Sequence, residues 1–364
     1  MDASPPLTAT RPAAFGLSDA FDAVPGYLNA ASLGLPPRAT VEALRTAVDD
    51  WAAGRARAAD FDVPVNASRA AYARIVGVDA AQVAVGNQVS VTSGLVAASL
   101  PDGAEVVTVD GDFTSVTFPF LVHADRGVTV RHVPLHALAD EVRPSTALVA
   151  FSLVQSADGR IADAPAVVEA ARRVGALTYC DLTQAVGWLP VRAGDFDVTA
   201  CGAYKWLCSP RGTAFTTVGP AAAAALRPLH AGWYAGASPW TSVYGPQMHL
   251  ADDARRFDLS PAWLAWAGTA PALELFAAAD PAAVHAHAVG LADAFLAELD
   301  LPPRGSAIVA LPDPDADLQR RLAAAGCVVA GRAGRARLAF HAWNTPDDVR
   351  RAATAARPTS ARGR

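Results

Sequence analysis

The stretch Ala200-Cys201-Gly202-Ala203-Tyr204-Lys205-Trp206-Leu207 contains the only lysine among the 30 Lys and Arg residues of this chain. Arg replaces Lys almost equally well as a solvated surface charge, but a guanidinium keeps its proton whereas a desolvated amine can lose it. Tyr204 and Trp206 flank Lys205, which indicates a partly buried position. The pattern predicts that Lys205 takes part in chemistry, and a Schiff base is the first hypothesis.

On both sides of this stretch, short β-type runs alternate with helical segments. Helices are expected at 38–57, 90–99 and 164–174. Strands that alternate with helices indicate a mostly parallel sheet covered on both faces, so the sequence predicts a large α/β domain. Its seven strands are expected at 82–85, 105–109, 128–134, 146–154, 176–181, 198–204 and 213–218.

The pattern changes after Gly219. A short helix at 220–226 precedes an irregular loop, 227–258, whose aromatic residues are Trp233, Tyr234, Trp240 and Tyr244. A long aromatic loop of this kind is more often functional than idle. A small α+β domain is then expected from helices at 261–278, 281–299, 316–325 and 346–356 and strands at 306–311, 327–330 and 335–341. The expected organisation is an N-terminal arm (1–25), a large domain (26–259), a small C-terminal domain (260–357) and a tail (358–364).

Composition narrows the class of protein. A net charge of −5 with scattered arginines gives no reason to expect a nucleic-acid partner. No signal core precedes Pro25, and no apolar run approaches the ~20 residues that cross a membrane. The four cysteines show no disulfide or C-x-x-C spacing, so we expect a cytoplasmic protein. No metal site is expected, because the one close histidine pair, His285 and His287, reads as solvated.

Polar residues follow several predicted strands, and in open α/β sheets the ligand lies outside the carboxyl ends of the strands. The first strand leads into Gly86-Asn87-Gln88-Val89-Ser90, a helix start whose free N–H groups suit a phosphate. The second leads into Gly111-Asp112-Phe113-Thr114-Ser115, and the fourth into Gln155-Ser156-Ala157-Asp158-Gly159.

The ends of the fifth and sixth strands carry the pair that matters most. Asp181 ends an apolar run, where a carboxylate needs a cationic partner, and Lys205 follows the next strand. This ordered set is what pyridoxal phosphate chemistry needs. The lysine forms an imine with the cofactor aldehyde, the carboxylate keeps the pyridine nitrogen protonated, and Phe113 can stack on the ring.

Five motifs carry a resemblance to a known family: Tyr27-Leu28-Asn29, Asp181-Leu182-Thr183-Gln184-Ala185-Val186-Gly187, Tyr204-Lys205-Trp206-Leu207, Arg256-Phe257-Asp258 and Arg337-Leu338-Ala339-Phe340-His341-Ala342-Trp343-Asn344-Thr345. From about Tyr27 to Thr345 the sequence resembles the aminotransferase class V family of fold-type-I enzymes. Kynureninases, cysteine desulfurases and isopenicillin N epimerase-like proteins are members of it. The resemblance implies the fold-type-I transferase fold, pyridoxal 5'-phosphate as cofactor and an amino acid as substrate.

The resemblance also implies a role for each matching residue at the cofactor. Lys205 would be the Schiff-base lysine, Asp181 the partner of the pyridine nitrogen and Gln184 a hydrogen-bond partner of the phenolic oxygen. Phe113 would stack on the ring. The residues expected to hold the phosphate are Val89, Ser90 and Tyr204, with Ser260 from a neighbouring subunit, which implies a homodimer.

On the substrate side, the resemblance assigns Arg337 to a bidentate grip on the carboxylate. Gln155 and Asn29 are expected to lie near the same group. The aromatic loop at 227–258 is expected to select the substrate side chain.

Which substrate bond breaks is left open. Transamination and β-elimination of the C–S lyase type are the leading candidates and Cα epimerisation is an alternative; all begin with removal of the Cα proton by Lys205. A desulfurase is disfavoured, because its nucleophilic cysteine would have to be Cys327, at the start of a predicted strand. Kynureninase is disfavoured because its motif usually has His at the position of Gln184. A cofactor-binding protein without turnover is the non-enzymatic alternative.

Other enzyme classes lack their motifs. The chain contains no G-x-G-x-x-G run for a nicotinamide cofactor, no Gly-Lys-Ser/Thr for a P-loop and no G-x-S-x-G for a serine nucleophile.

Overall fold

The structure, a computed structural model, describes residues 16–22 and 24–357. The predicted tail and most of the predicted arm lie outside these ranges. Within the described part of the arm, Gly16–Ala20 forms a 3-10 helix. Leu17 and Phe21 are buried, and the Phe21 ring meets the Trp343 ring edge to face at 5.2 Å. This part of the arm therefore packs into the core, whereas the sequence pattern had indicated a surface segment.

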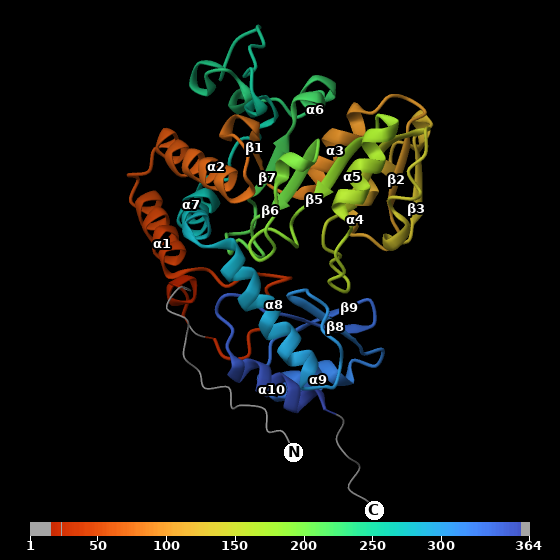
Figure 1. The fold of residues 1–364 in the computed structure, drawn as a ribbon. Helices are drawn as coiled ribbons and strands as arrows, with labels where there is room; N and C mark the ends of the chain where they lie inside the picture. Colours follow the sequence, from red (N-terminus) through yellow and green to blue (C-terminus); the bar gives the residue numbers. More distant parts are fainter. Residues whose placement is uncertain (1–15, 23, 358–364) are drawn as a thin grey trace, which may run out of the picture.

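The large domain is built on a seven-stranded sheet in the order β1-β7-β6-β5-β4-β2-β3 (Figure 1). β7 runs antiparallel to β1 and β6, and the other pairs are parallel. This confirms the predicted α/β class, and all seven strands lie where they were expected. They are β1 (Val83–Gly86), β2 (Glu105–Val109), β3 (Thr129–Val133), β4 (Thr146–Ser152), β5 (Leu177–Asp181), β6 (Val198–Gly202) and β7 (Ala214–Val218).

Alternate side chains of the sheet enter two different cores. Val149 and Phe151 of β4 belong to the core that includes helices α2 (Asp62–Val76), α5 (Ala164–Val174) and α7 (Trp263–Ala278). Leu148 and Ala150 belong to the core with α3 (Val89–Ser99), α4 (Thr114–Leu121) and α6 (Pro220–Ala225). Because successive strand residues point to opposite faces, apolar runs without polar alternation produce a sheet buried on both sides.

Two helices of the large domain differ from the expectation. Helix α1 (Arg38–Ala52) ends earlier than predicted, and α2 was not predicted. Both pack against α7. The expected domain boundary between residues 259 and 260 assigns α7 to the small domain, so the packing partners of α7 lie on the other side of that boundary.

The small domain contains a three-stranded antiparallel sheet in the order β8-β10-β9. Its strands are β8 (Ile308–Pro312), β9 (Ala330–Arg332) and β10 (Arg335–Ala339), and its helices are α8 (Pro281–Ala297), α9 (Asp317–Ala324) and α10 (Pro346–Ala356). β9 begins later than expected, because Val328 pairs with Tyr27 instead. No helix in the described ranges is both long and apolar enough to cross a lipid bilayer.

The segment Tyr27–Asn29 joins this small sheet from outside. Leu28 accepts a backbone hydrogen bond from Ala339 and donates one to Val328, each at 2.9 Å. The residues that follow, up to Gly34, therefore lie beside β10, the strand that carries Arg337. This contact brings residues more than 300 positions apart in sequence to one place.

Candidate active site

Asp181 and Lys205 meet at the carboxyl edge of the sheet. Asp181 is the last residue of β5, and it lies opposite Ser152 of β4 and Ala200 of β6. Lys205 follows the end of β6 by three residues. The two charged groups interact electrostatically, each shifting the pKa of the other. The two residues that the sequence singled out at strand ends therefore lie at the same edge of the sheet.

Lys205 is buried, with 5% of its surface exposed. Its Nζ lies 5.4 Å from the centroid of the Phe113 ring and 5.5 Å from that of the Tyr204 ring. Burial lowers the pKa of Lys205 to about 8, while the charge of Asp181 acts in the opposite direction. An amine with this pKa is neutral in a large fraction of molecules near physiological pH, which a nucleophile or base requires.

Two glycines allow other segments to approach the loop that carries the lysine. Gly34 donates its N–H to the Tyr204 carbonyl at 3.0 Å, and a Cβ at Gly34 would lie 2.0 Å from the Lys205 carbonyl oxygen. A Cβ at Gly187, whose φ is +112°, would lie 2.4 Å from the Trp206 carbonyl oxygen. Side chains at these positions would displace the loop, so the loop depends on both glycines.

His341 holds the same loop from the small domain. Its Nε2 lies 2.8 Å from the Trp206 carbonyl oxygen, and because a carbonyl only accepts, Nε2 carries the proton. Burial lowers the pKa of His341 to about 4, so the ring is neutral. Through His341, the small domain therefore contacts Trp206, the residue after Lys205, directly.

Asp181 is almost fully buried and accepts a hydrogen bond from the Thr183 N–H at 2.9 Å. Burial raises the pKa of Asp181 to about 6, while the hydrogen bonds from Thr183 and the charge of Lys205 oppose this shift. The carboxylate is therefore ionised at neutral pH.

Asp112 is a buried carboxylate to which the sequence assigned no role. It accepts hydrogen bonds from the N–H and hydroxyl of Ser152 (2.8 and 2.5 Å), from the Phe113 N–H (2.7 Å) and from Gln155 Nε2 (3.3 Å). Gln155 was expected beside the substrate carboxylate, but its amide nitrogen is bound to Asp112 and to the Ser152 carbonyl. Asp112 thus fixes the start of the segment that presents Phe113.

Trp206, the residue after the lysine, fixes the orientation of the Gln184 amide. Its Oε1 accepts from Trp206 Nε1 at 2.8 Å, which leaves Nε2 as the donor toward Ala31 O (3.0 Å) and Ser156 Oγ (3.2 Å). Gln184 therefore presents donors on the side of Ser156.

Arg337 is buried without a carboxylate partner within 4.0 Å in the described part of the chain. Its Nη1 donates to Ser156 O (2.6 Å) and Ser156 Oγ (3.1 Å), and its Nη2 donates to Ser32 Oγ (2.8 Å). Its Nε has no partner among the described residues. The buried Oδ1 of Asn29 has none there either, and the Asn29 backbone pairs with Ala339, two residues after Arg337 on β10. Burial lowers the pKa of Arg337 to about 10, so it stays charged. Such a cation is ready to receive an anion.

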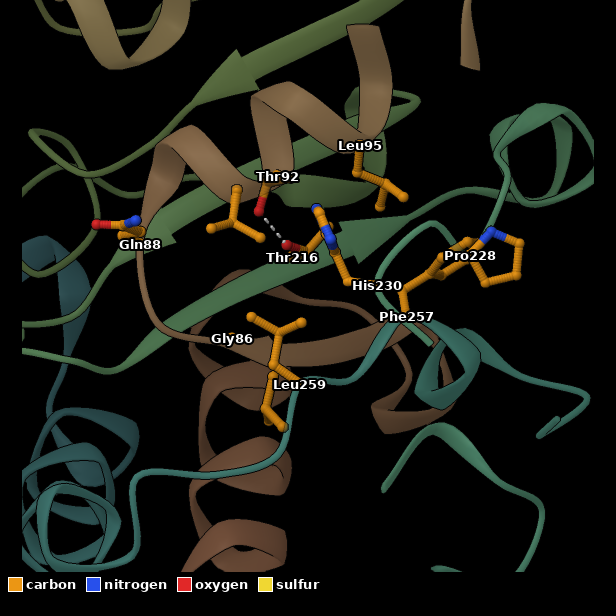
Figure 2. A pocket seen from close by; sticks show the side chains of 11 residues that line it. Gly86, Gln88, Thr92, Leu95, Thr216, Pro228, His230, Phe257 and Leu259 are labelled. Atoms are coloured by element: carbon orange, nitrogen blue, oxygen red, sulfur yellow. Dashed lines mark hydrogen bonds between the residues drawn. The ribbon is translucent and has the colours of Figure 1, made fainter. Parts of the chain in front are cut away.

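The start of α3 offers donors at the far end of the site. Gln88 is its N-cap residue and makes no side-chain capping bond, so the first N–H groups at Val89 and Ser90 are left for a ligand. Figure 2 shows Gln88 and Leu259 on the wall of a small pocket beside this helix start. Leu259 donates to Val85 O at 3.0 Å, which places the exposed Ser260 next to β1.

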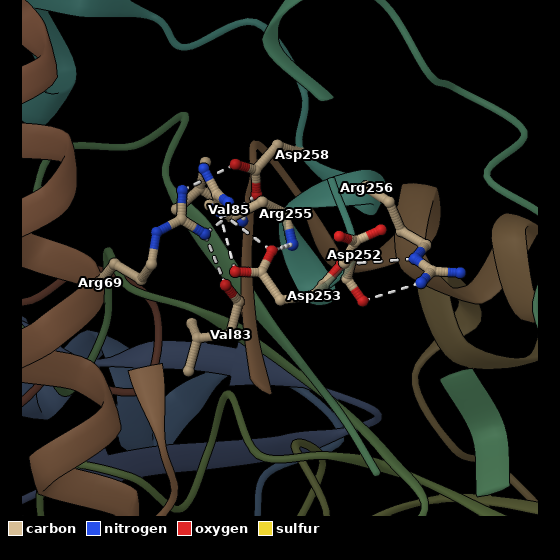
Figure 3. A network of polar contacts seen from close by, with 8 residues as sticks. All are labelled: Arg69, Val83, Val85, Asp252, Asp253, Arg255, Arg256 and Asp258. Carbon is tan, nitrogen blue, oxygen red and sulfur yellow. Dashed lines mark hydrogen bonds and ion pairs between the residues drawn. The ribbon is translucent and has the colours of Figure 1, made fainter. Parts of the chain in front are cut away.

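A buried ion pair fixes that segment (Figure 3). Arg69 of α2 binds Asp258 with 2.7 Å between Nη2 and Oδ2, and both side chains are buried. The same carboxylate accepts the Val85 N–H at 2.8 Å. Asp258, the last residue of the predicted Arg-Phe-Asp motif, therefore has a structural contact to β1.

The aromatic loop does not approach Lys205 within the described chain. Tyr234 and Trp240 donate to the carboxylate of Asp62 (2.9 and 2.5 Å) at the start of α2. The loop projects from the end of the large domain opposite the small domain (Figure 1). Its expected role in selecting the substrate side chain therefore has no support within one chain and stays a prediction.

The histidine pair is also not solvated as expected. The His285 ring stacks on Trp188 at 5.8 Å, and Nε2 of His287 lies 3.1 Å from Asn344 O. No group of three or more His, Cys, Asp or Glu side chains among the described residues is arranged to hold a metal ion.

A lysine and a carboxylate at adjacent strand ends, with a small domain supplying an unpaired arginine, define an enzyme of the fold-type-I class. The family model described as aminotransferase class-V matches residues 57–317. The chain belongs to this family, which confirms the predicted resemblance.

Relatives agree with this assignment. The chain is 30% identical over 218 residues to an uncharacterised aminotransferase, YcbU, of Bacillus subtilis (strain 168), a match that covers 57% of each chain. It is 29% identical to a kynureninase of Deinococcus radiodurans over 74% of this chain and 70% of that one. The chain thus spans little more than half of the length of the Bacillus relative.

A solved structure shows the same fold. The cystine C-S lyase C-DES superimposes with a TM-score of 0.82 at 18% identity, covering 91% of this chain and 97% of the lyase. A variant structure of that lyase has glycine covalently linked to its PLP cofactor.

Proposed function

We propose that the protein is a pyridoxal-phosphate-dependent enzyme that removes the Cα proton of an amino acid and catalyses transamination or β-elimination. The observation that carries the proposal is the buried Lys205, with a pKa lowered to about 8, beside Asp181 at the adjacent strand end. When bound, the cofactor supplies an electron sink for the negative charge at Cα.

The residues present fit this cofactor at each of its polar groups. Lys205 supplies the amine that binds the aldehyde, and the ionised Asp181 suits a protonated ring nitrogen. The uncapped start of α3 suits the phosphate, and we propose Tyr204 as a further contact to it. Phe113, whose side chain is 40% exposed, offers a ring face. Gln184 Nε2 donates to Ala31 O and Ser156 Oγ, and it would donate to the phenolic oxygen in place of Ser156 Oγ.

Arg337 would bind the substrate carboxylate through its guanidinium, with Asn29 beside it. This would orient the Cα–H bond toward Lys205, which then acts as the base. Gln155 Nε2 is already bound to Asp112, and the substrate-binding role expected of Gln155 stays a prediction.

Cysteine desulfurase chemistry lacks its nucleophile. Cys327 is buried, and burial raises the pKa of its thiol. Cys180, Cys201 and Cys208 are buried as well, with raised pKa values. A thiol attack needs an accessible thiolate, so transamination and β-elimination are the reactions we propose.

A panel of amino acids tests the reaction type. We expect the holoenzyme either to release ammonia and a 2-oxo acid from a β-substituted amino acid, or to transfer the amino group to a 2-oxo acid acceptor. Deuterium exchange at Cα without net product would instead indicate an epimerase. A Lys205→Arg variant serves as the blank, and a panel without any response would contradict the proposal.

The rate of cofactor capture should depend on pH. Because the Lys205 pKa is lowered to about 8, the neutral amine accumulates as pH rises through 8, and the capture rate of apoenzyme should level off above it. The negative charge of Asp181 raises the Lys205 pKa, so Asp181→Asn should move the midpoint to lower pH. Stopped-flow absorbance with pyridoxal phosphate measures both. A midpoint of the capture rate near pH 10 would contradict the lowered pKa of a buried Lys205.

Arg337→Gln should weaken substrate binding by about 1.5–3 kcal/mol, the scale of a hydrogen bond to a charged group. Steady-state kinetics should show this as a raised KM. Arg335→Gln is the matched control: Arg335 lies on the same strand, and in the described part of the chain its side chain donates only to Ala333 O. An equal effect of both variants would remove the carboxylate role from Arg337.

We also propose a cytoplasmic homodimer. Four free cysteines support a reducing compartment. Exposed apolar side chains that a second copy would cover support the dimer; they are Trp51, Trp263, Leu229, Tyr244 and Met248. The exposed Ser260 lies where relatives contribute a phosphate contact across the subunits. Sedimentation velocity is the test, and a monomeric holoenzyme would contradict the dimer.

A further inference from the structure

We propose that Arg332 and Ser32, next to Arg337, form a second anion subsite, and that the substrate is an amino acid whose side chain carries an acidic group. This inference rests on the proposed function and adds the class of substrate to it.

The two guanidinium groups share one hydroxyl. Arg332 Nη2 donates to Ser32 Oγ at 3.3 Å, and Arg337 Nη2 donates to the same oxygen at 2.8 Å. Arg332 lies on the edge strand β9, which pairs with β10. Two cations held around a single neutral acceptor repel each other, so the arrangement favours a bound anion that lies between them.

Neither arginine has a carboxylate within 4.0 Å in the described ranges, although most surface arginines here do. The remaining contact of Arg332 is Nη1 to the carbonyl of Gly331. Its side chain is exposed, so it can reach an anion that enters from solvent.

The charges at this end of the site are out of balance. Arg332 and Arg337 both lower the pKa of Lys205 and the pKa of Arg337 is lowered by Arg332, so the three cations lie within electrostatic reach of one another. Asp181 offsets the charge of Lys205, and the α-carboxylate of a substrate offsets that of Arg337, which leaves Arg332 without a counter-charge. The cofactor phosphate does not offset Arg332, because its proposed seat is the start of α3, in the large domain. A second acidic group on the substrate would match the remaining charge.

Spectral titration of the holoenzyme with acid and amide pairs tests the inference. The probes are L-aspartate against L-asparagine and L-glutamate against L-glutamine, with L-alanine as a reference. We expect at least one acid to bind about tenfold more tightly than its amide, a preference of the size that one charge pair provides. Arg332→Gln should bring that ratio close to one, and it should weaken the binding of the acid more than the binding of L-alanine.

Arg335→Gln is again the matched control and should keep the preference for the acid. Equal affinities for acid and amide in the unmodified enzyme, or an equal loss for all probes in Arg332→Gln, would overturn the subsite and leave the proposed function intact. No spectral response to any amino acid would overturn the proposed function and the subsite together.

Discussion

Lys205→Arg is expected to abolish turnover, with a loss of at least about 10²–10⁴-fold, the usual contribution of one positioned proton-transfer group. Arg keeps the positive charge beside Asp181, but its guanidinium neither binds an aldehyde nor accepts the Cα proton. Since no other lysine exists in the chain, no neighbouring amine can replace it. The measurement is kcat on the best substrate of the panel.

Lys205→Ala separates loss of chemistry from loss of cofactor. It removes both the charge and the amine, so we expect at most noncovalent cofactor and the same absence of turnover. Circular dichroism should show that both variants fold. Turnover above a tenth of the wild-type kcat in either variant would contradict the role of Lys205.

Arg69→Met is expected to lower the free energy of unfolding by about 3–5 kcal/mol, because it leaves the carboxylate of Asp258 buried without its cation. Both side chains are nearly inaccessible, at 6% and 1% exposure. Asp258 also accepts the Val85 N–H. If this bond is lost, the segment that leads to Ser260 loses an attachment to β1. Urea unfolding followed by circular dichroism measures the change.

A second ion pair of α2 provides the control. Arg74 binds Glu274 at 2.6 Å, but both side chains are about half exposed. Arg74→Met should therefore cost at most about 1 kcal/mol. The double variant Arg69→Met/Asp258→Leu should regain part of the stability lost in Arg69→Met, because no unpaired charge stays buried. Equal costs for Arg69→Met and Arg74→Met would contradict the structural importance of the buried pair.

The sequence was most informative for residues whose position depends on a single element of the fold, such as one strand or its end. Most strands of the large sheet are buried on both faces and have largely apolar sequences. The edge strand β3 is more exposed but is rich in β-branched residues, so all seven could be predicted. The positions of Lys205 and Asp181 followed, because parallel strands bring their carboxyl ends to one edge. Helix α2 was missed because its buried face, which includes Val65 and Tyr72, also carries Ser68 and Arg69, and these polar residues interrupt the apolar period.

The substrate end of the site could not be predicted from local pattern. Ser32 and Arg337 meet across 305 positions, and Ser156 reaches Arg337 across 181. The bond from Gln155 to Asp112 could not be predicted, because the two residues follow different strands. The direction in which the aromatic loop leaves the large domain likewise depends on distant contacts, such as that of Tyr234 with Asp62 across 172 positions.

Borohydride reduction of the holoenzyme followed by peptide mass mapping tests most directly whether Lys205 holds the cofactor. The account predicts one phosphopyridoxyl group per chain, on the peptide that contains Lys205, and none in Lys205→Arg. Because Lys205 is the only lysine, a label on any other peptide could come only from an N-terminal amine. A holoenzyme that carries no reducible link at Lys205 would contradict the account.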